Sequence, residues 1–136
     1  MKLKELEELR WATEPSQSYG TGKRDLEDPS LILIWANIND IFNHTSQWQR
    51  LPIGDPSGGE TGKARRISCA QEHWTSGGYM NPSLIHVVNG KYLEFTDGRH
   101  RLIAADLMGH TYALVLTDKS TIEQFKEMVK TRPFQR

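Results

Sequence analysis

The alternation of hydrophobic and polar positions is clearest in the second half of the chain. Residues 83–88 (SLIHVV) and 91–96 (KYLEFT) are strand-like runs, and the dipeptide Asn89-Gly90 joins them. Asn-Gly favours the type I′ turn, whose twist matches that of two paired antiparallel strands. The pattern therefore predicts a β-hairpin that ends at Thr96.

A helix and another strand are predicted after this hairpin. The run GRHRLIAADLMG has apolar residues at helical spacing, so we expect Leu102, Ile103 and Leu107 to point inward. Gly109 is the expected stop of that helix, since glycine commonly ends helices. The next run, TYALVLT at residues 111–117, predicts a strand.

The first half contains one clear strand. Residues 31–38 (LILIWANI) form a continuous apolar run that is short enough for a buried strand. Asn39 and Asp40 then favour a short helical turn that reaches Phe42.

A final helix is predicted near the C-terminus. Ser120 and Glu123 have the spacing of a capping box, in which each side chain caps a backbone N–H of the first turn. Apolar residues then recur at helical spacing and predict the buried face of this helix. They are Ile122, Phe125, Met128 and Val129.

The first 29 residues are predicted to form an N-terminal helix and a loop, followed by a domain over residues 30–136. Leucines recur every third residue between charged residues at the start, which indicates a narrow amphipathic helix that ends before Pro15. Residues 13–30 hold turn formers and charges without a period, which is typical of a loop. The leucines of the expected helix are Leu3, Leu6 and Leu9.

The middle of the chain predicts a long surface loop and a helix. Residues 45–62 are rich in glycine and proline, which regular elements tolerate poorly, and surface loops of this length often carry function. Helix-forming residues return over 63–74, and Gly77-Gly78 would end that helix. Strands mixed with helices, one pair of strands being a hairpin, predict a single α/β (α+β) domain with a small mixed sheet.

Composition narrows the function classes. The 136 residues include 17 basic and 17 acidic side chains, so the broad positive charge of a dedicated nucleic-acid-binding protein is absent. One cysteine, Cys69, excludes an internal disulfide, and no metal site is predicted. No apolar run approaches the roughly 20 residues of a membrane span, and the N-terminus lacks a signal-peptide pattern. We expect a cytoplasmic protein without a membrane partner.

The predicted strand-to-helix turn at residues 96–101 (TDGRHR) is the strongest candidate site. The first N–H groups of a helix have no partner within the helix, and the helix dipole is positive there, so anions bind well. Asp97 is expected to cap the helix, and Gly98 lets a ligand approach the backbone. Arg99, His100 and Arg101 supply donors for phosphate oxygens. A solvated, capped helix end is the alternative, but cations in the first turn oppose the dipole and favour an anion site.

The hairpin, the motif F-T-D-G-R-H-R-L-I-A-A, the helix ending at Gly109 and the next strand together resemble the core signature of the ParB/sulfiredoxin-like superfamily. The resemblance spans roughly residues 30–130, and the stretch 84–117 is the specific part. It implies a nucleotide-phosphate site at this motif, filled by a nucleoside triphosphate (ATP or CTP) with Mg²⁺. In sulfiredoxins a catalytic cysteine would stand where this chain has Arg99, so thiol chemistry is disfavoured. The arginine-rich turn of the chromosome-partition proteins is also missing.

Carried over to this chain, the resemblance places phosphates on the amides of Gly98, Arg99 and His100 and on the side chains of His100 and Arg101. An earlier helix adds basic residues in such proteins, and residues 63–74 are the counterpart here. Helical spacing puts Arg66 and His73 on one face of that helix, and Arg65, Ser68 and Glu72 on another. We favour Arg66 and His73, with a solvated helix surface as the equal alternative, and expect the preceding loop to bring Lys63 to the site.

Three functions remain open on these residues. The first is an enzyme that hydrolyses or transfers a phosphoryl group: His100 and Arg101 stabilise charge, and a carboxylate, Asp97, Glu94 or Glu72, activates the attacking group. The second is a nuclease or toxin that acts on the backbone of DNA or RNA, with His100 as acid or base. The third is a non-catalytic regulator or inhibitor that uses the anion pocket for recognition.

Overall fold

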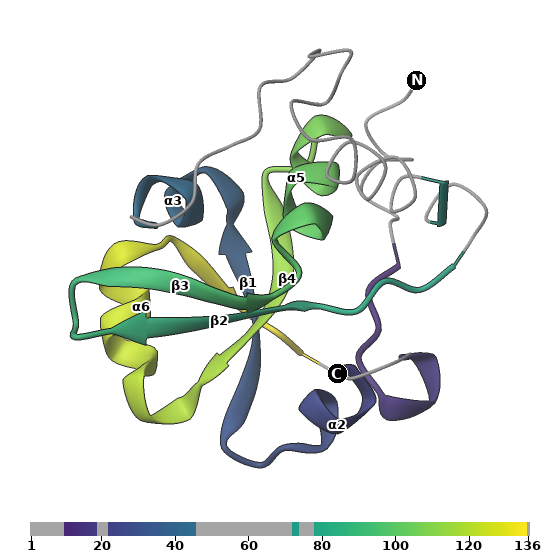
Figure 1. Cartoon of the computed structure of the whole chain (residues 1–136), viewed down its shortest axis with the longest axis horizontal. Helices are drawn as coiled ribbons and strands as arrows, with labels where there is room; N and C mark the ends of the chain where they lie inside the picture. Colours follow the sequence, from purple (N-terminus) through teal and green to yellow (C-terminus); the bar gives the residue numbers. More distant parts are fainter. Residues whose placement is uncertain (1–9, 19–21, 46–71, 74–77, 136) are drawn as a thin grey trace.

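The computed structural model of the chain describes residues 10–18, 22–45, 72–73 and 78–135, and for Asp97 and Arg99 the backbone alone. These residues form a small mixed α/β domain with a five-stranded sheet and four helices (Figure 1). The elements, in chain order, are η1 (Pro15–Gln17), α2 (Gly22–Glu27), β1 (Leu31–Asn37), α3 (Ile38–Asn43), β2 (Ser83–Val88), β3 (Tyr92–Asp97), α5 (Arg99–Leu107), β4 (Tyr112–Asp118), η2 (Lys119–Thr121), α6 (Ile122–Met128) and β5 (Thr131–Pro133).

The sheet has the strand order β3-β2-β4-β1-β5. β2 and β4 run parallel, whereas the other neighbouring pairs are antiparallel, so the sheet is mixed as the sequence predicts. β1 and β4 pair over their whole lengths, from Leu31 opposite Asp118 to Asn37 opposite Tyr112. β5 pairs only with Ile34, Trp35 and Ala36, so among the described residues no strand lies on the outer side of the start of β1.

The predicted hairpin is confirmed. Asn89 (φ 54°) and Gly90 (φ 66°) both have positive φ, and the Lys91 N–H donates to the Val88 carbonyl at 3.0 Å. These are the features of a type I′ turn. The register shifts between Leu84 and Ile85, so β2 and β3 are locally irregular close to the end of β3.

The helix predicted after the hairpin is also confirmed, but one of the three residues expected to point inward does not. Leu102 and Ile103 are buried, and Gly109 has the positive φ of a helix stop (91°). Leu107, in contrast, is 38% exposed. The helix buries four consecutive residues in its middle, whereas its last residue projects beyond the packed part. Leu102, Ile103, Ala104 and Ala105 are those residues.

Four short elements differ from the sequence prediction. Residues 13–30, expected to be a loop, contain η1 and α2. Strand β5 was not predicted, because three residues that include a proline carry no strand pattern. Ser120 does not cap α6: it lies inside η2, and Thr121 is the N-cap without a side-chain hydrogen bond. The capping box was overridden because a 3₁₀ turn joins β4 to the helix.

Some predictions fall on residues that the structure does not describe. The N-terminal leucines, nearly all of the loop at 45–62 and most of the helix at 63–74 belong to this group. Glu72 and His73 are described, and both are helical.

One large hydrophobic cluster joins the helices to the sheet. Phe125 and Val129 of the C-terminal helix are buried with Ile34 of β1 and Ile85 of β2, as the apolar face of α6 predicts. A second, smaller cluster of Leu31, Leu84 and Leu116 packs against Leu26 of α2. Figure 1 shows α2 and α6 at different sides of the sheet.

A polar turn starts β1. The Asp28 carboxylate accepts hydrogen bonds from the N–H and the hydroxyl of Ser30, at 2.9 and 2.7 Å. These two bonds hold the pKa of Asp28 below its ordinary value, because they stabilise the ionised carboxylate. The Leu31 N–H donates to the Asp28 carbonyl, so the chain turns directly into the strand.

The helices that the structure describes are all too short or too polar to cross a bilayer.

Candidate functional site

The candidate phosphate turn is the passage from β3 into α5, which Figure 1 shows as an uninterrupted strand-to-helix connection. Asp97 is the last residue of β3, Gly98 is the N-cap with φ 90° and ψ 14°, and Arg99 begins the helix. The expectation that Asp97 caps the helix is therefore wrong. Asp97 stays extended because it is still paired with Leu84, so the cap position falls to a residue without a side chain.

Ser83 holds this turn in place. It is fully buried, and its hydroxyl donates to the Gly98 carbonyl at 2.8 Å. The same carbonyl accepts the first helical hydrogen bond, from the Leu102 N–H at 3.1 Å. Both bonds fix the carbonyl at the start of the helix and direct it away from the first amides. Sequence analysis missed Ser83, since it lies 15 positions before Gly98 and only the strand pairing brings the two together.

Glycine is the only residue type that fits at position 98 without strain. Its φ lies in the left-handed region, which other residues adopt only with strain. A Cβ at residue 98 would lie 2.8 Å from the Ser83 Cα and 2.6 Å from the Arg101 Nη2 atom. The backbone of β2 and a guanidinium group thus both lie against Gly98. The guanidinium is therefore folded back onto the helix start.

The first turn of α5 concentrates positive charge where the helix dipole is already positive. Arg99, His100 and Arg101 are its first three residues, and it contains no acidic residue. His100 and Arg101 are half-buried, and the Nε2 atom of His100 and the Nε atom of Arg101 are buried. By helix geometry the N–H groups of these three residues have no acceptor within the helix. The arrangement can bind an anion through amides and through side chains.

The other predicted phosphate ligands are not brought to this turn by any described contact. Lys63 and Arg66 lie outside the described residues. The His73 Nε2–H donates to the Tyr79 carbonyl, so this ring nitrogen already has a hydrogen-bond partner in the backbone. A phosphate contact through His73 Nε2 would require that bond to break.

The candidate carboxylates have different surroundings. Asp97 adjoins the turn through its backbone. Glu94 is half-buried in β3 and lies opposite His86, whose ring Nδ1 is 2.6 Å from an Asp118 oxygen. Glu72 is exposed. Within the described part of the chain, no three His, Cys, Asp or Glu side chains gather in a way that would hold a metal ion.

Comparisons of the chain with models of protein families, with curated proteins and with solved structures find no match. Its function is therefore inferred from the geometry of the turn and from the motif around it.

Proposed function

We propose that the turn between β3 and α5 binds the phosphates of a nucleoside triphosphate, and that the chain is a ParB/sulfiredoxin-like protein that hydrolyses or transfers a phosphoryl group. The position of the Arg101 guanidinium against Gly98, at a helix start that carries no side-chain cap, is the observation that supports this proposal most strongly.

Electrostatics give the physical reason. A guanidinium beside a helix N-terminus is repelled by the dipole, and a bound anion reduces that repulsion. A phosphate placed there accepts hydrogen bonds from the amides and from the planar guanidinium at once. A bound phosphate would therefore stabilise the positive charge that gathers at this helix start.

Within this proposal the residues of the turn have separate roles. The amides of Gly98, Arg99 and His100 hold phosphate oxygens, and Arg101 stabilises the charge that develops on the transferring group. Mg²⁺ would be carried mainly by phosphate oxygens and water, and would neutralise part of their charge. His100 and Asp97 are the groups nearest in sequence that can move a proton, so both are the first to test as acid or base.

Calorimetry with ATP, CTP and a DNA duplex, each with and without Mg²⁺, tests the proposal. We expect a nucleotide to bind the unchanged chain and Arg101→Ala to bind it at least about tenfold more weakly, because a charge-assisted hydrogen bond is lost. Arg132→Ala is the matched control. Arg132 lies in β5, the opposite edge strand from β3, and stacks on Tyr112 there.

The outcomes separate the competing functions. Nucleotide binding with release of phosphate in the presence of Mg²⁺ supports the enzyme, and nucleotide binding without turnover supports a regulator. DNA binding that weakens steeply with salt, without nucleotide binding, supports the nuclease or toxin. Equal affinities of Arg101→Ala and Arg132→Ala for every ligand would reject a phosphate site at this turn.

A further inference from the structure

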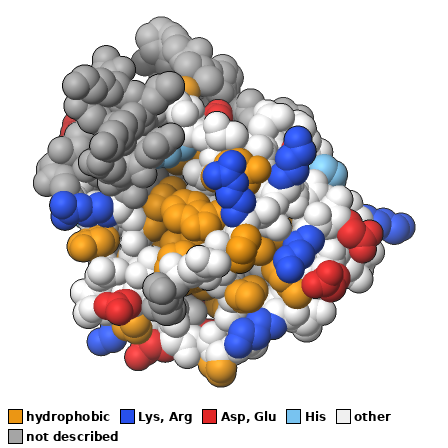
Figure 2. Space-filling model, turned by 180° about the vertical axis from the view of Figure 1, so that it is seen from behind, with side chains coloured by type: hydrophobic (Ala, Val, Ile, Leu, Met, Phe, Trp, Pro, Cys, Tyr) orange, Lys and Arg blue, Asp and Glu red, His pale blue; other side chains and the backbone are white. Residues whose placement is uncertain are grey.

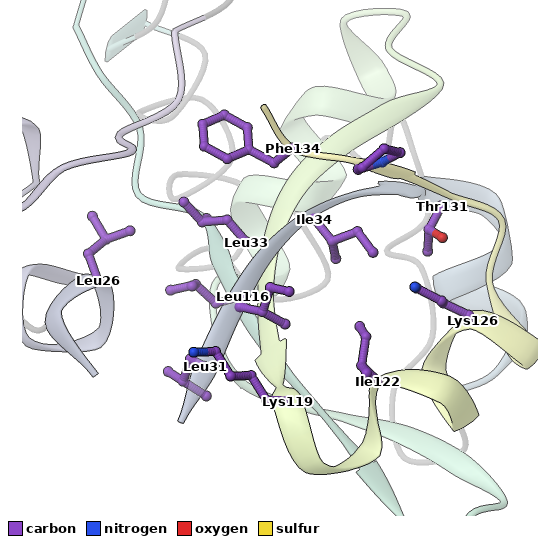
Figure 3. A pocket seen from close by; sticks show the side chains of 12 residues that line it. Leu26, Leu31, Leu33, Ile34, Leu116, Lys119, Ile122, Lys126, Thr131 and Phe134 are labelled. Atoms are coloured by element: carbon purple, nitrogen blue, oxygen red, sulfur yellow. The ribbon is translucent and has the colours of Figure 1, made fainter. Parts of the chain in front are cut away.

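A groove follows the outer edge of β1, at the other end of the sheet from the phosphate turn. We call it the β1 groove; its volume is about 700 Å³. Leu31 and Leu33 lie on one side of the strand in Figure 3, and Ile34 and Ile122 lie on the other. The strand edge itself thus forms the floor between two apolar walls. On the side of the molecule seen in Figure 2, hydrophobic side chains likewise gather among lysine and arginine side chains.

Backbone N–H and C=O groups on the outer edge of β1 lie at the floor of the β1 groove. The Ser30 carbonyl accepts from the Lys119 N–H beside β4, whereas the Asn37 N–H donates to the Lys130 carbonyl beside β5. Because successive residues of a strand direct their backbone groups to opposite neighbours, Leu31 and Leu33 direct theirs to the outer side.

Among the residues that the structure describes, no strand pairs with that outer side at the start of β1. The ladder between β1 and β5 ends with Ile34 opposite Pro133, before Leu33. The Leu31 N–H is used by Asp28, but within the described residues no backbone group reaches the Leu33 N–H or the Leu31 carbonyl. One residue of an added strand that runs parallel to β1 would satisfy both groups.

Two lysines contribute positive charge to the β1 groove. The Lys126 side chain enters it from α6, and Lys119 enters it from η2 (Figure 3). Lys126 also lies 3.8 Å from Glu123, but both side chains are well exposed (47% and 82%), so this ion pair holds the lysine only weakly. The groove therefore combines an open strand edge, apolar walls and two ammonium groups.

We propose that the β1 groove binds an extended peptide segment of another protein, in which aliphatic residues alternate with Asp or Glu, as an additional strand beside Leu31 and Leu33. Strand addition supplies affinity through the main chain, and alternate side chains give specificity. The aliphatic residues of the segment fill the apolar walls, while its carboxylates meet Lys119 and Lys126. A second copy of this chain fits less well, because two such edges would bring like charges together.

Synthetic peptides provide the test. The probe is an end-blocked peptide of alternating valine and glutamate with a fluorescent label, and the matched peptide has lysine in place of glutamate. A third peptide carries N-methyl groups on alternate residues, which removes the N–H groups that strand addition needs. Fluorescence anisotropy gives the affinities, and amide hydrogen exchange followed by NMR reports protection at Leu33.

We expect the glutamate peptide to bind and to protect the Leu33 amide, and the lysine and N-methylated peptides not to bind. Lys119→Glu and Lys126→Glu should each weaken binding about fivefold, because an attraction becomes a repulsion. Lys91→Glu is the control: Lys91 is exposed in the β2–β3 turn, away from the groove, and the change should leave the affinity unaltered. Thermal melting verifies that all variants are folded.

Three results would overturn the proposal. The first is that no peptide binds, and the second is that N-methylation or the two groove variants leave the affinity unchanged. The third is a protein that is already dimeric by light scattering with the Leu33 amide protected, since a second copy would then occupy the edge. Nucleotide affinity is expected to be the same in Lys119→Glu and Lys126→Glu, so failure of one proposal does not imply failure of the other.

Discussion

At the scale of single residues, Gly98 is the residue that most determines the geometry of the turn between β3 and α5. It converts a strand into a helix without an intervening loop, and it does so in a left-handed conformation. Ser83 lies close enough that even a methyl group has no room. The sequence predicted that Gly98 lets a ligand approach the backbone, whereas the structure places Ser83 and the Arg101 guanidinium against it.

The first prediction concerns this glycine. We expect Gly98→Ala to destabilise the domain by at least about 2 kcal/mol, because the left-handed backbone strain adds to the clash with Ser83. Gly90→Ala should cost about 1 kcal/mol, since its φ is also positive but its Cβ would meet Gln124 only at 3.7 Å. Urea denaturation followed by circular dichroism measures both. Equal losses in the two variants would mean that the Ser83 contact is relieved by a small backbone shift.

At the scale of elements, α5 shows where a periodic pattern succeeds and where it does not. Its position, its start after Gly98 and its end at Gly109 all follow from the sequence. Its buried face does not, because the helix packs on more than one side in its middle but leaves Leu107 38% exposed at its end. Periodicity gives the direction of a side chain, whereas burial also depends on how far the neighbouring elements extend.

A second prediction uses two leucines of this helix. We expect Leu102→Ala to lower the free energy of unfolding by about 2–5 kcal/mol, since a fully buried side chain leaves a cavity. Leu107→Ala should lower it by less than about 1 kcal/mol, because that leucine is partly in water. Denaturant titration compares the same chemical change at both positions. Similar losses would contradict the assigned orientation of α5.

The short elements α2 and β5 were not predicted for a different reason. α2 and β5 have six and three residues, too few to complete a hydrophobic period. β5 exists because the chain that leaves α6 meets the outer edge of β1, so tertiary packing creates the strand. The β1 groove has the same origin, since it lies along that edge and continues beyond the end of β5.

At the scale of the whole molecule, the chain before β1 contributes to the same core as the sheet. Trp11 is 6% exposed and belongs to the main hydrophobic cluster, and it forms a parallel bridge with Met80. The Ala12 N–H donates to the Met80 carbonyl, and the Met80 N–H donates to the Arg10 carbonyl. Segments some 70 residues apart in sequence are thereby joined.

The third prediction follows from this bridge. Trp11→Ala should destabilise the domain by about 3–5 kcal/mol in a single cooperative transition, because a large buried ring is removed from the common core. Near-ultraviolet and far-ultraviolet circular dichroism during heating report the packing and the sheet. Two separate transitions, in the variant or in the unchanged chain, would show that the segment around Trp11 folds apart from the sheet.

By itself the sequence determined the elements whose reasons are local. The Asn89-Gly90 turn, the strand at Leu31–Asn37 and the helix between two glycines depend on residue type and on hydrophobic period, which need no knowledge of distant residues. The sequence also predicted an anion site at the turn around Gly98. The Arg101→Ala variant tests that prediction.

Only the tertiary structure decided the contacts between residues that lie far apart in the sequence. The hydroxyl of Ser83 on the Gly98 carbonyl, the burial of Trp11 beside Met80 and the open edge at Leu33 all depend on which strands become neighbours. Strand order is set by the packing of the whole core, so no local pattern contains it. For the same reason the motif at Gly98 could be recognised in the sequence, whereas the β1 groove could not.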